Sequence, residues 1–303
     1  MPAGSRSGKP SGSFGGERET VPDLLRQHPL SENEVHFLAR TVRETWSAAV
    51  GTERADEAER AHRAVMDLEA LVDDTVERVR HGAPHGVDDA LTFLEADPWC
   101  FRSGYAKERL LRSLGTVEFT EAQRRRGAAV VRSYVLGPDR REFRPVGRLV
   151  RALDAEVRPF LLATLSRGAP VAARHALWLL LELPDLDPAT LVLPRAREVL
   201  LGACHSEDRY YQQMGWLTAA ARRLSSDEWI ATVTAEALGT GAPAPLRLLA
   251  VLPGVQLSPE QQQQLTELII NDITSGQLTL PVEELGNLCG RPELDLPAPD
   301  RAS

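Results

Sequence analysis

The chain has 303 residues, of which 43% are hydrophobic, 26% are charged and only 5% are aromatic. These proportions are typical of a soluble folded protein, and the longest apolar run, near residues 176–181, is far too short to cross a bilayer. The three cysteines, Cys100, Cys204 and Cys289, lie too far apart for a disulfide framework or a zinc-ligand spacing, which fits a reducing cytoplasm.

The net charge of −8 hides an uneven distribution. Residues 1–101 carry 11 basic and 19 acidic side chains, residues 102–151 carry 13 and 5, and residues 152–303 carry 11 and 19. A basic block therefore lies between two acidic regions. Because only Lys9 and Lys107 are lysines, the preference for arginine is chain-wide and does not by itself indicate a binding site.

Residues 1–21 are rich in Gly, Ser and Pro and lack the apolar centre of a signal peptide, so we expect a disordered tail. Residues 22–86 predict a helical hairpin that packs on its own chain rather than on a second copy. A capping box at Ser31 and Glu34 starts its first helix, and Gly51-Thr52 links it to the second. The expected core faces are Val35, Leu38, Val42, Trp46 and Ala49, and then Ala58, Ala61, Val65, Leu68, Val72, Thr75 and Val79.

Residues 87–297 predict amphipathic helices that alternate with short turns, and strand signals are limited to short pieces such as Thr190–Leu193. Three joints recur 69 residues apart, beginning at Leu114, Leu183 and Leu252, and weaker joints at Leu153 and Leu224 halve the interval to about 34.5 residues. Each strong joint is expected to bury one apolar residue and to restart on a helix cap, for which Thr120 and Ser258 are the best candidates. The three apolar residues are Val117, Leu186 and Val255.

This period and pattern resemble the HEAT-like family of α-solenoids over about residues 87–297. The resemblance implies an all-α, right-handed superhelix of five or six helix pairs, in which each pair buries its apolar face on its neighbours. The chain lacks the regular family signature, and residues 154–158 come closest to it. A plain helical domain with accidental spacing is the alternative, and residues 298–303 are expected to form a C-terminal tail.

The segment Asp97–Leu114, DPWCFRSGYAKERLLRSL, allows two interpretations. The favoured one makes Trp99 and Phe101 a plug that covers the first repeat under the hairpin, with Cys100 as a small buried residue. The other is an aromatic-lined pocket in which Arg102 and Tyr105 make polar contacts.

The basic block 102–151 also allows two interpretations. Arg124, Arg125 and the arginines that follow would form a stripe for a phosphate backbone or an acidic partner if corresponding helices lined one face. Alternatively, they are the solvated face of a helix whose other side holds Ala128, Val131 and Tyr134. Nucleic acid is disfavoured because the acidic flanks would repel it.

Trp216 lies on the polar side of its predicted helix, opposite the core positions Leu217, Ala221 and Leu224. An exposed Trp beside Arg223 has the composition of an interface hot spot. Packing of Trp216 against the next helix pair is an equal alternative.

Signatures of catalysis are absent from the sequence. His81 and His85 precede Asp88 and Asp89, but the intervening glycines and proline predict a loop, so a metal site is disfavoured. The sequence therefore predicts a non-catalytic, cytoplasmic scaffold without cofactor that binds a protein or peptide partner. The alternatives are a nucleic-acid-binding HEAT-like protein and a HEAT-like enzyme such as a DNA glycosylase. The predicted partner-binding residues are Arg102, Tyr105, Arg124, Arg125, Trp216 and Arg223.

Overall fold

The computed structural model describes residues 28–51, 54–83, 85–140, 142–187, 191, 193–204, 210–252 and 254–274. These residues form thirteen α-helices and no strand, which confirms the all-α prediction. None of these helices combines the length and the hydropathy that a membrane span requires. Both predicted tails, Cys289 and Thr190 lie outside the described residues.

The chain divides into two compact units, Met1–Ala106 and Lys107–Ser303. The first unit contains α2 (Glu32–Ala49), α3 (Ala55–Arg80) and α4 (Gly86–Ala96), and α5 (Ser103–Leu114) begins in it. Residues 87–106, which the sequence analysis assigned to the repeat region, thus belong to the same unit as the hairpin.

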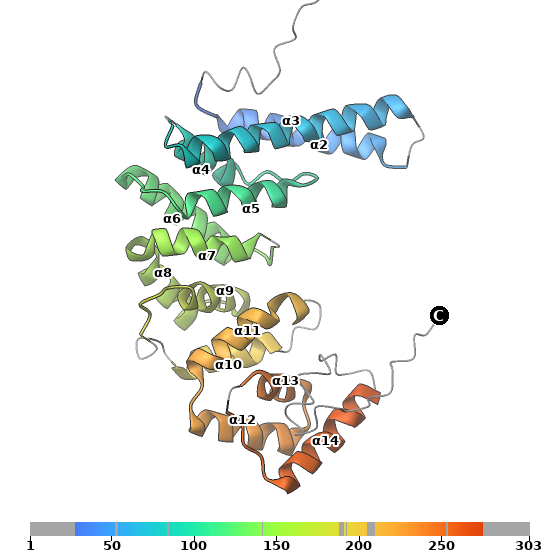
Figure 1. Ribbon diagram of the computed structural model, residues 1–303, viewed down its shortest axis with the longest axis vertical. Helices are drawn as coiled ribbons and strands as arrows, with labels where there is room; N and C mark the ends of the chain where they lie inside the picture. The colour runs from blue at the N-terminus through green and yellow to red at the C-terminus, as the bar shows by residue number, and fades with distance from the viewer. Residues whose placement is uncertain are drawn as a thin grey trace, which may run out of the picture. The chain divides into compact units, whose positions relative to one another are not determined.

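In the first unit, α2 and α3 pack side by side as a hairpin, and α4 packs against both (Figure 1). The predicted capping box is confirmed, because the Glu34 amide donates to the Ser31 hydroxyl at 3.3 Å and the Ser31 amide donates to the Glu34 carboxylate at 2.7 Å. Gly51 has a φ of 81°, a conformation that glycine adopts without strain, and it ends the turn after α2.

One end of the hairpin is closed by contacts to α4. The Asp89 carboxylate accepts a hydrogen bond of 2.7 Å from the Leu30 amide, just before α2, and forms an ion pair with Arg78 in the last turns of α3. Burial raises the pKa of Asp89 by more than these two partners lower it. Gly86 lies so close to α3 that an added Cβ would be 2.7 Å from the Arg78 carbonyl carbon. These contacts place the start of α4 at the C-terminal end of α3.

The second unit continues from α5 through nine further helices (Figure 1). Their bounds are α6 (Glu121–Leu136), α7 (Phe143–Ala152), α8 (Asp154–Arg167), α9 (Pro170–Leu181), α10 (Leu193–Cys204), α11 (Tyr210–Leu224), α12 (Asp227–Thr240), α13 (Pro243–Val251) and α14 (Pro259–Thr274).

Helix packing in the second unit follows chain order. Helix α6 contacts α7, α8 and α9, α10 contacts α8, α9, α11 and α13, and α12 contacts α13 and α14. Within the described part of the unit, no contact of comparable extent joins α6–α8 to α11–α14. Each helix therefore depends on near neighbours in the chain for its burial.

The five joints that the sequence predicts precede α6, α8, α10, α12 and α14, which are alternate helices of the unit. All five joint leucines are buried, namely Leu114, Leu153, Leu183, Leu224 and Leu252. Of the three residues expected to be buried after the strong joints, only Leu186 is buried. Val117 and Val255 are half-exposed, and at the first joint the buried residue is Phe119 instead.

Two of the predicted helix caps in this unit are confirmed. The Thr120 hydroxyl accepts a hydrogen bond from the Gln123 amide at 3.3 Å at the start of α6. The Ser258 hydroxyl accepts one from the Gln261 amide, also at 3.3 Å, before α14. Both side chains satisfy amide groups that have no partner within the helix.

Candidate peptide-binding site

The loop 97–102, between α4 and α5, has an unusual backbone. Asp97 and Arg102 at its two ends have positive φ angles of 44° and 65°, which is uncommon for residues other than glycine. Ser103 holds the turn, since its hydroxyl donates to the Cys100 carbonyl at 2.8 Å and accepts from the Cys100 amide at 3.2 Å. Strained backbone of this kind is typical of sites where the surrounding structure imposes a functional geometry.

This loop presents aromatic side chains rather than burying them. Trp99 is 80% exposed, so the favoured prediction that it plugs a core is wrong. Phe101 is 41% exposed and stacks on Trp46 of α2, with ring centroids 3.6 Å apart and planes 9° apart. Cys100, predicted to be buried, is half-exposed. The sequence predicts that both aromatics cover the first repeat under the hairpin, but among the described residues no helix covers Trp99.

Beside the stacked rings lies a pocket of about 390 Å³ between α2 and α3. Its walls are mainly apolar, and the polar side chains among them are His62 and Arg102. The lining residues are Trp46, Ala49, Val50, Ala58, Ala61, His62, Val65, Phe101 and Arg102. An apolar pocket with a few polar groups is the usual form of a binding site for a small ligand or for an anchoring side chain.

Arg102 connects the loop to the hairpin. Its guanidinium lies 2.8 Å from the Glu69 carboxylate on α3 and 5.7 Å from the centre of the Tyr105 ring. Tyr105 is 43% exposed but does not line the pocket. The structure thus places Phe101 and Arg102 at one pocket, as the alternative interpretation expects. Trp46 joins them although it was predicted as a core residue of the hairpin, and Tyr105, the other predicted polar contact, does not line the pocket.

The predicted basic stripe is only partly available in the second unit. Arg125 is exposed, but Arg124 donates to the Glu156 carboxylate at 3.2 Å and to the Ala152 carbonyl at 3.5 Å. On the opposite side of α6, Val131 and Tyr134 are buried, as the amphipathic interpretation predicts. Arg124 therefore links α6 to α8, and its charge is offset by a neighbour.

Trp216 and Arg223 also bind within the fold. Trp216 is only 7% exposed and stacks on Trp178 of α9, with ring centroids 5.3 Å apart, so packing replaces the hot-spot interpretation. The Arg223 guanidinium donates to the Leu181 carbonyl at the end of α9 and to the Leu186 carbonyl at 3.3 Å. Both residues link α11 to the end of α9. Trp216 is buried, whereas Arg223 is half-exposed.

A buried polar cluster that the sequence analysis missed joins α9 to the turn after α6. His175 Nε2 lies 2.6 Å from the Asp139 carboxylate, its Nδ1 lies 3.1 Å from the Val135 carbonyl, and Arg174 forms an ion pair with Asp139. Burial acts to raise the pKa of Asp139, but the hydrogen bonds from His175 and Arg174 outweigh it and lower that pKa. Since His175 is buried and stacked on Phe143, this cluster fixes packing and is closed to a substrate.

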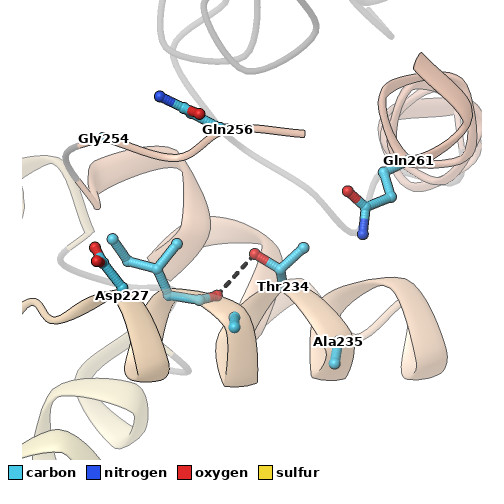
Figure 2. A pocket seen from close by; sticks show the side chains of 8 residues that line it. Asp227, Thr234, Ala235, Gly254, Gln256 and Gln261 are labelled. Atoms are coloured by element: carbon cyan, nitrogen blue, oxygen red, sulfur yellow. Dashed lines mark hydrogen bonds between the residues drawn. The ribbon is translucent and has the colours of Figure 1, made fainter. Parts of the chain in front are cut away.

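A second pocket, of about 460 Å³, lies between α12, residues 254–256 and α14 (Figure 2). Figure 2 shows the Asp227, Gln256 and Gln261 side chains that line it, and the Thr234 hydroxyl, which donates to the Ile230 carbonyl at 2.7 Å. These groups contain a carboxylate and amides but no paired base and nucleophile, so the pocket does not indicate a reaction.

The possible metal ligands and the buried Cys204 thiol do not form a reactive site among the described residues. Across the described ranges, no group of three His, Cys, Asp or Glu side chains is placed to hold a metal ion, and His81 pairs instead with Glu77 at 3.4 Å. Burial raises the pKa of the Cys204 thiol to about 12, which keeps it protonated and unreactive at neutral pH.

Comparisons with known proteins identify no relative of this chain. No protein-family model matches the sequence, and searches of the curated proteins and of the solved structures give no significant match.

Proposed function

We propose that the chain is a non-catalytic helical-repeat scaffold that binds a protein or peptide partner at the pocket beside Trp46 and Phe101. The observation that carries this proposal is the loop 97–102, which exposes Trp99 and stacks Phe101 on Trp46 in the lining of an apolar pocket. Exposed aromatic groups next to an arginine have the composition of energetic hot spots in protein interfaces.

The repeat architecture is proposed for the second unit as a HEAT-like α-solenoid. Three features support it: the joints mark alternate helices, the joint leucines are buried, and helix packing follows chain order. Helix pairs that bury their faces only on adjacent pairs form quasi-one-dimensional arrays.

A nucleic-acid-binding role draws less support. Arginines of the basic block pair with carboxylates inside the second unit: Arg112 pairs with Glu108, Arg124 lies 3.2 Å from Glu156, and Arg151 lies 3.8 Å from Glu182. This pairing reduces the positive field that a phosphate backbone requires.

Selection from a random peptide display library on the full chain tests the proposal. We expect the enriched peptides to bind the wild-type chain and to lose at least tenfold in affinity on Ala58→Arg, which places a charge in the pocket. Ala58 is exposed on a helix, so arginine is compatible with the fold there. The matched control is Ala48→Arg, at an exposed position of α2 that does not line the pocket. Peptides that bind wild-type and Ala58→Arg chains equally would contradict the proposed site.

A further inference from the structure

The apolar residues of the hairpin continue along both helices beyond the part of the hairpin that is buried. On α2, Val35 and Val42 are buried, but Trp46 and Ala49 further along the same face are half-exposed. On α3 the residues from Val79 back to Ala61 are buried at the core positions, but Ala58 is exposed, contrary to the sequence prediction. Both helices therefore carry apolar side chains to the tip of the hairpin, where less covers them.

The lengths of the helices explain why α4 covers only part of the hairpin. Helix α3 has 26 residues and is about 39 Å long, whereas α4 has 11 residues and is about 16 Å long. Because α4 starts at the C-terminal end of α3, it reaches less than half-way along the hairpin, which Figure 1 shows extending beyond α4. The loop 97–102 follows, with Arg102 paired to Glu69 near the middle of α3.

We propose that the groove between α2 and α3, which the described residues of the first unit leave partly exposed, accepts an amphipathic helix of a partner protein, which takes the position of a third helix at the tip of the hairpin. This inference rests on the proposed function and specifies the mode of recognition. Amphipathic helices bind grooves of this kind through apolar side chains at i, i+3, i+4 and i+7.

The lining of the groove favours a helix as the occupant. Ala49, Ala58 and Ala61 have small side chains that permit close approach of a partner backbone, and the stacked rings of Trp46 and Phe101 are part of the same lining. The volume of about 390 Å³ is near the lower limit for ligand pockets, which suits a few apolar side chains rather than a whole cofactor.

The charged residues that line the groove indicate which residues should flank the apolar face of the partner helix. The ionisable residues that line the groove are His62 and Arg102, and no carboxylate lines it among the described residues. The Arg102 side chain is 46% exposed beside its ion pair with Glu69. Although Arg102 pairs with Glu69, its guanidinium has five N–H donors and is accessible, so an Asp or Glu beside the apolar face of a partner helix can accept a hydrogen bond from it as well.

Selection from two matched 14-residue display libraries on the full chain tests the inference. One library has a helical frame randomised at i, i+3, i+4 and i+7 and at the flanking positions, and the other has a proline at every third position and cannot form a helix. We expect binders from the helical library alone, with bulky apolar residues flanked by Asp or Glu. Their affinity should fall at least tenfold on Ala58→Arg and remain unchanged on Ala48→Arg.

The other outcomes separate the inference from the function. Binders from the proline library that are lost on Ala58→Arg would overturn the helical mode but leave a peptide-binding pocket. Helical binders that ignore Ala58→Arg would place the site elsewhere and overturn the inference. The absence of binders from both libraries would contradict the proposed function as well. If the chain dimerises with increasing concentration and Ala58→Arg abolishes the dimer, the groove binds a second copy of the chain. That result would overturn the proposal of a different partner protein.

The role of Arg102 in binding acidic residues of the partner is tested by a separate variant. Arg102→Gln should weaken acid-flanked helical binders severalfold, and raised salt should reduce this difference because the contact is exposed. Equal binding to wild-type and Arg102→Gln chains, or enrichment of Lys and Arg at the flanks, would overturn the assignment of an acidic partner.

Discussion

The two units use their aromatic side chains in opposite ways. In the second unit, Phe143 stacks on His175 and Trp178 stacks on Trp216, and three of these four side chains are buried while Trp178 is half-exposed. In the first unit, Trp46 and Phe101 also stack, but Phe101 remains partly exposed and Trp99 is almost entirely exposed.

The difference shows that residue type alone does not separate a structural aromatic from one that is available to a partner. A stacked pair covered by neighbouring helices contributes to stability, while a stacked pair at the end of a groove leaves part of its surface for binding. Mutations in the two units should therefore affect different measurements, stability in one and partner affinity in the other.

The largest loss of stability is expected for Trp216→Ala. Removal of a buried Trp leaves a cavity, and such changes reduce the free energy of unfolding by about 3–5 kcal/mol. Urea unfolding of the full chain, followed by circular dichroism, measures this change. Trp216→Phe should cost much less because it keeps most of the ring contact with Trp178. Loss of binding without loss of stability in Trp216→Ala would show that this residue acts at a surface.

Asp139→Asn is expected to reduce the free energy of unfolding by about 1–3 kcal/mol at neutral pH, since it weakens hydrogen bonds of a buried cluster. The pKa of Asp139 lies below its ordinary value of 3.8 in the folded state. Its ionised form therefore stabilises the fold above about pH 4, and this contribution disappears as the pH falls through the lowered pKa.

The difference between the wild-type and Asp139→Asn chains should accordingly be full at neutral pH and shrink in acid. Asp185→Asn, at an exposed position, serves as the control and should change stability little at either pH. A difference that grows as the pH is lowered below 4 would contradict the assigned direction.

Arg102 allows a smaller test of backbone strain in the first unit. At a φ of 65°, glycine avoids a cost that alanine retains, so Arg102→Gly should be more stable than Arg102→Ala by about 1 kcal/mol. Both variants lose the pairing with Glu69, so their comparison isolates the backbone. Equal stabilities in urea unfolding would show that the loop is not strained at this residue.

The smallest change in stability is expected for Trp99→Ala, within about 0.5 kcal/mol of the wild-type chain, because an 80% exposed side chain makes few contacts. The same variant should bind the selected peptides more weakly if the loop contributes to the interface. A loss of stability comparable to that of Trp216→Ala would contradict the conclusion that Trp99, unlike Trp216, contributes little to the stability of the fold.

Local features of the fold could be predicted well from the sequence. Ser31, Thr120 and Ser258 form the expected caps, because a cap depends on residues three positions apart. The joint leucines were found by their spacing, and all of them are buried.

The exposure of single aromatics could not be predicted in the same way. Trp99 was expected inside and is exposed, while Trp216, on the polar side of its helix, is buried against Trp178. A helical period shows which residues share a face but not which other element covers that face. The Asp139–His175 cluster was missed for a related reason, since its members lie 36 positions apart in the chain.

The sequence by itself determined an all-α chain and the starts of the helices that follow Ser31, Thr120 and Ser258, because these depend on interactions over a few residues. Only the tertiary structure decided that α4 stops short of the hairpin tip and leaves Ala58, Trp46 and Phe101 beside an open groove. The physical reason is that burial depends on the length and position of neighbouring helices, which no local pattern encodes.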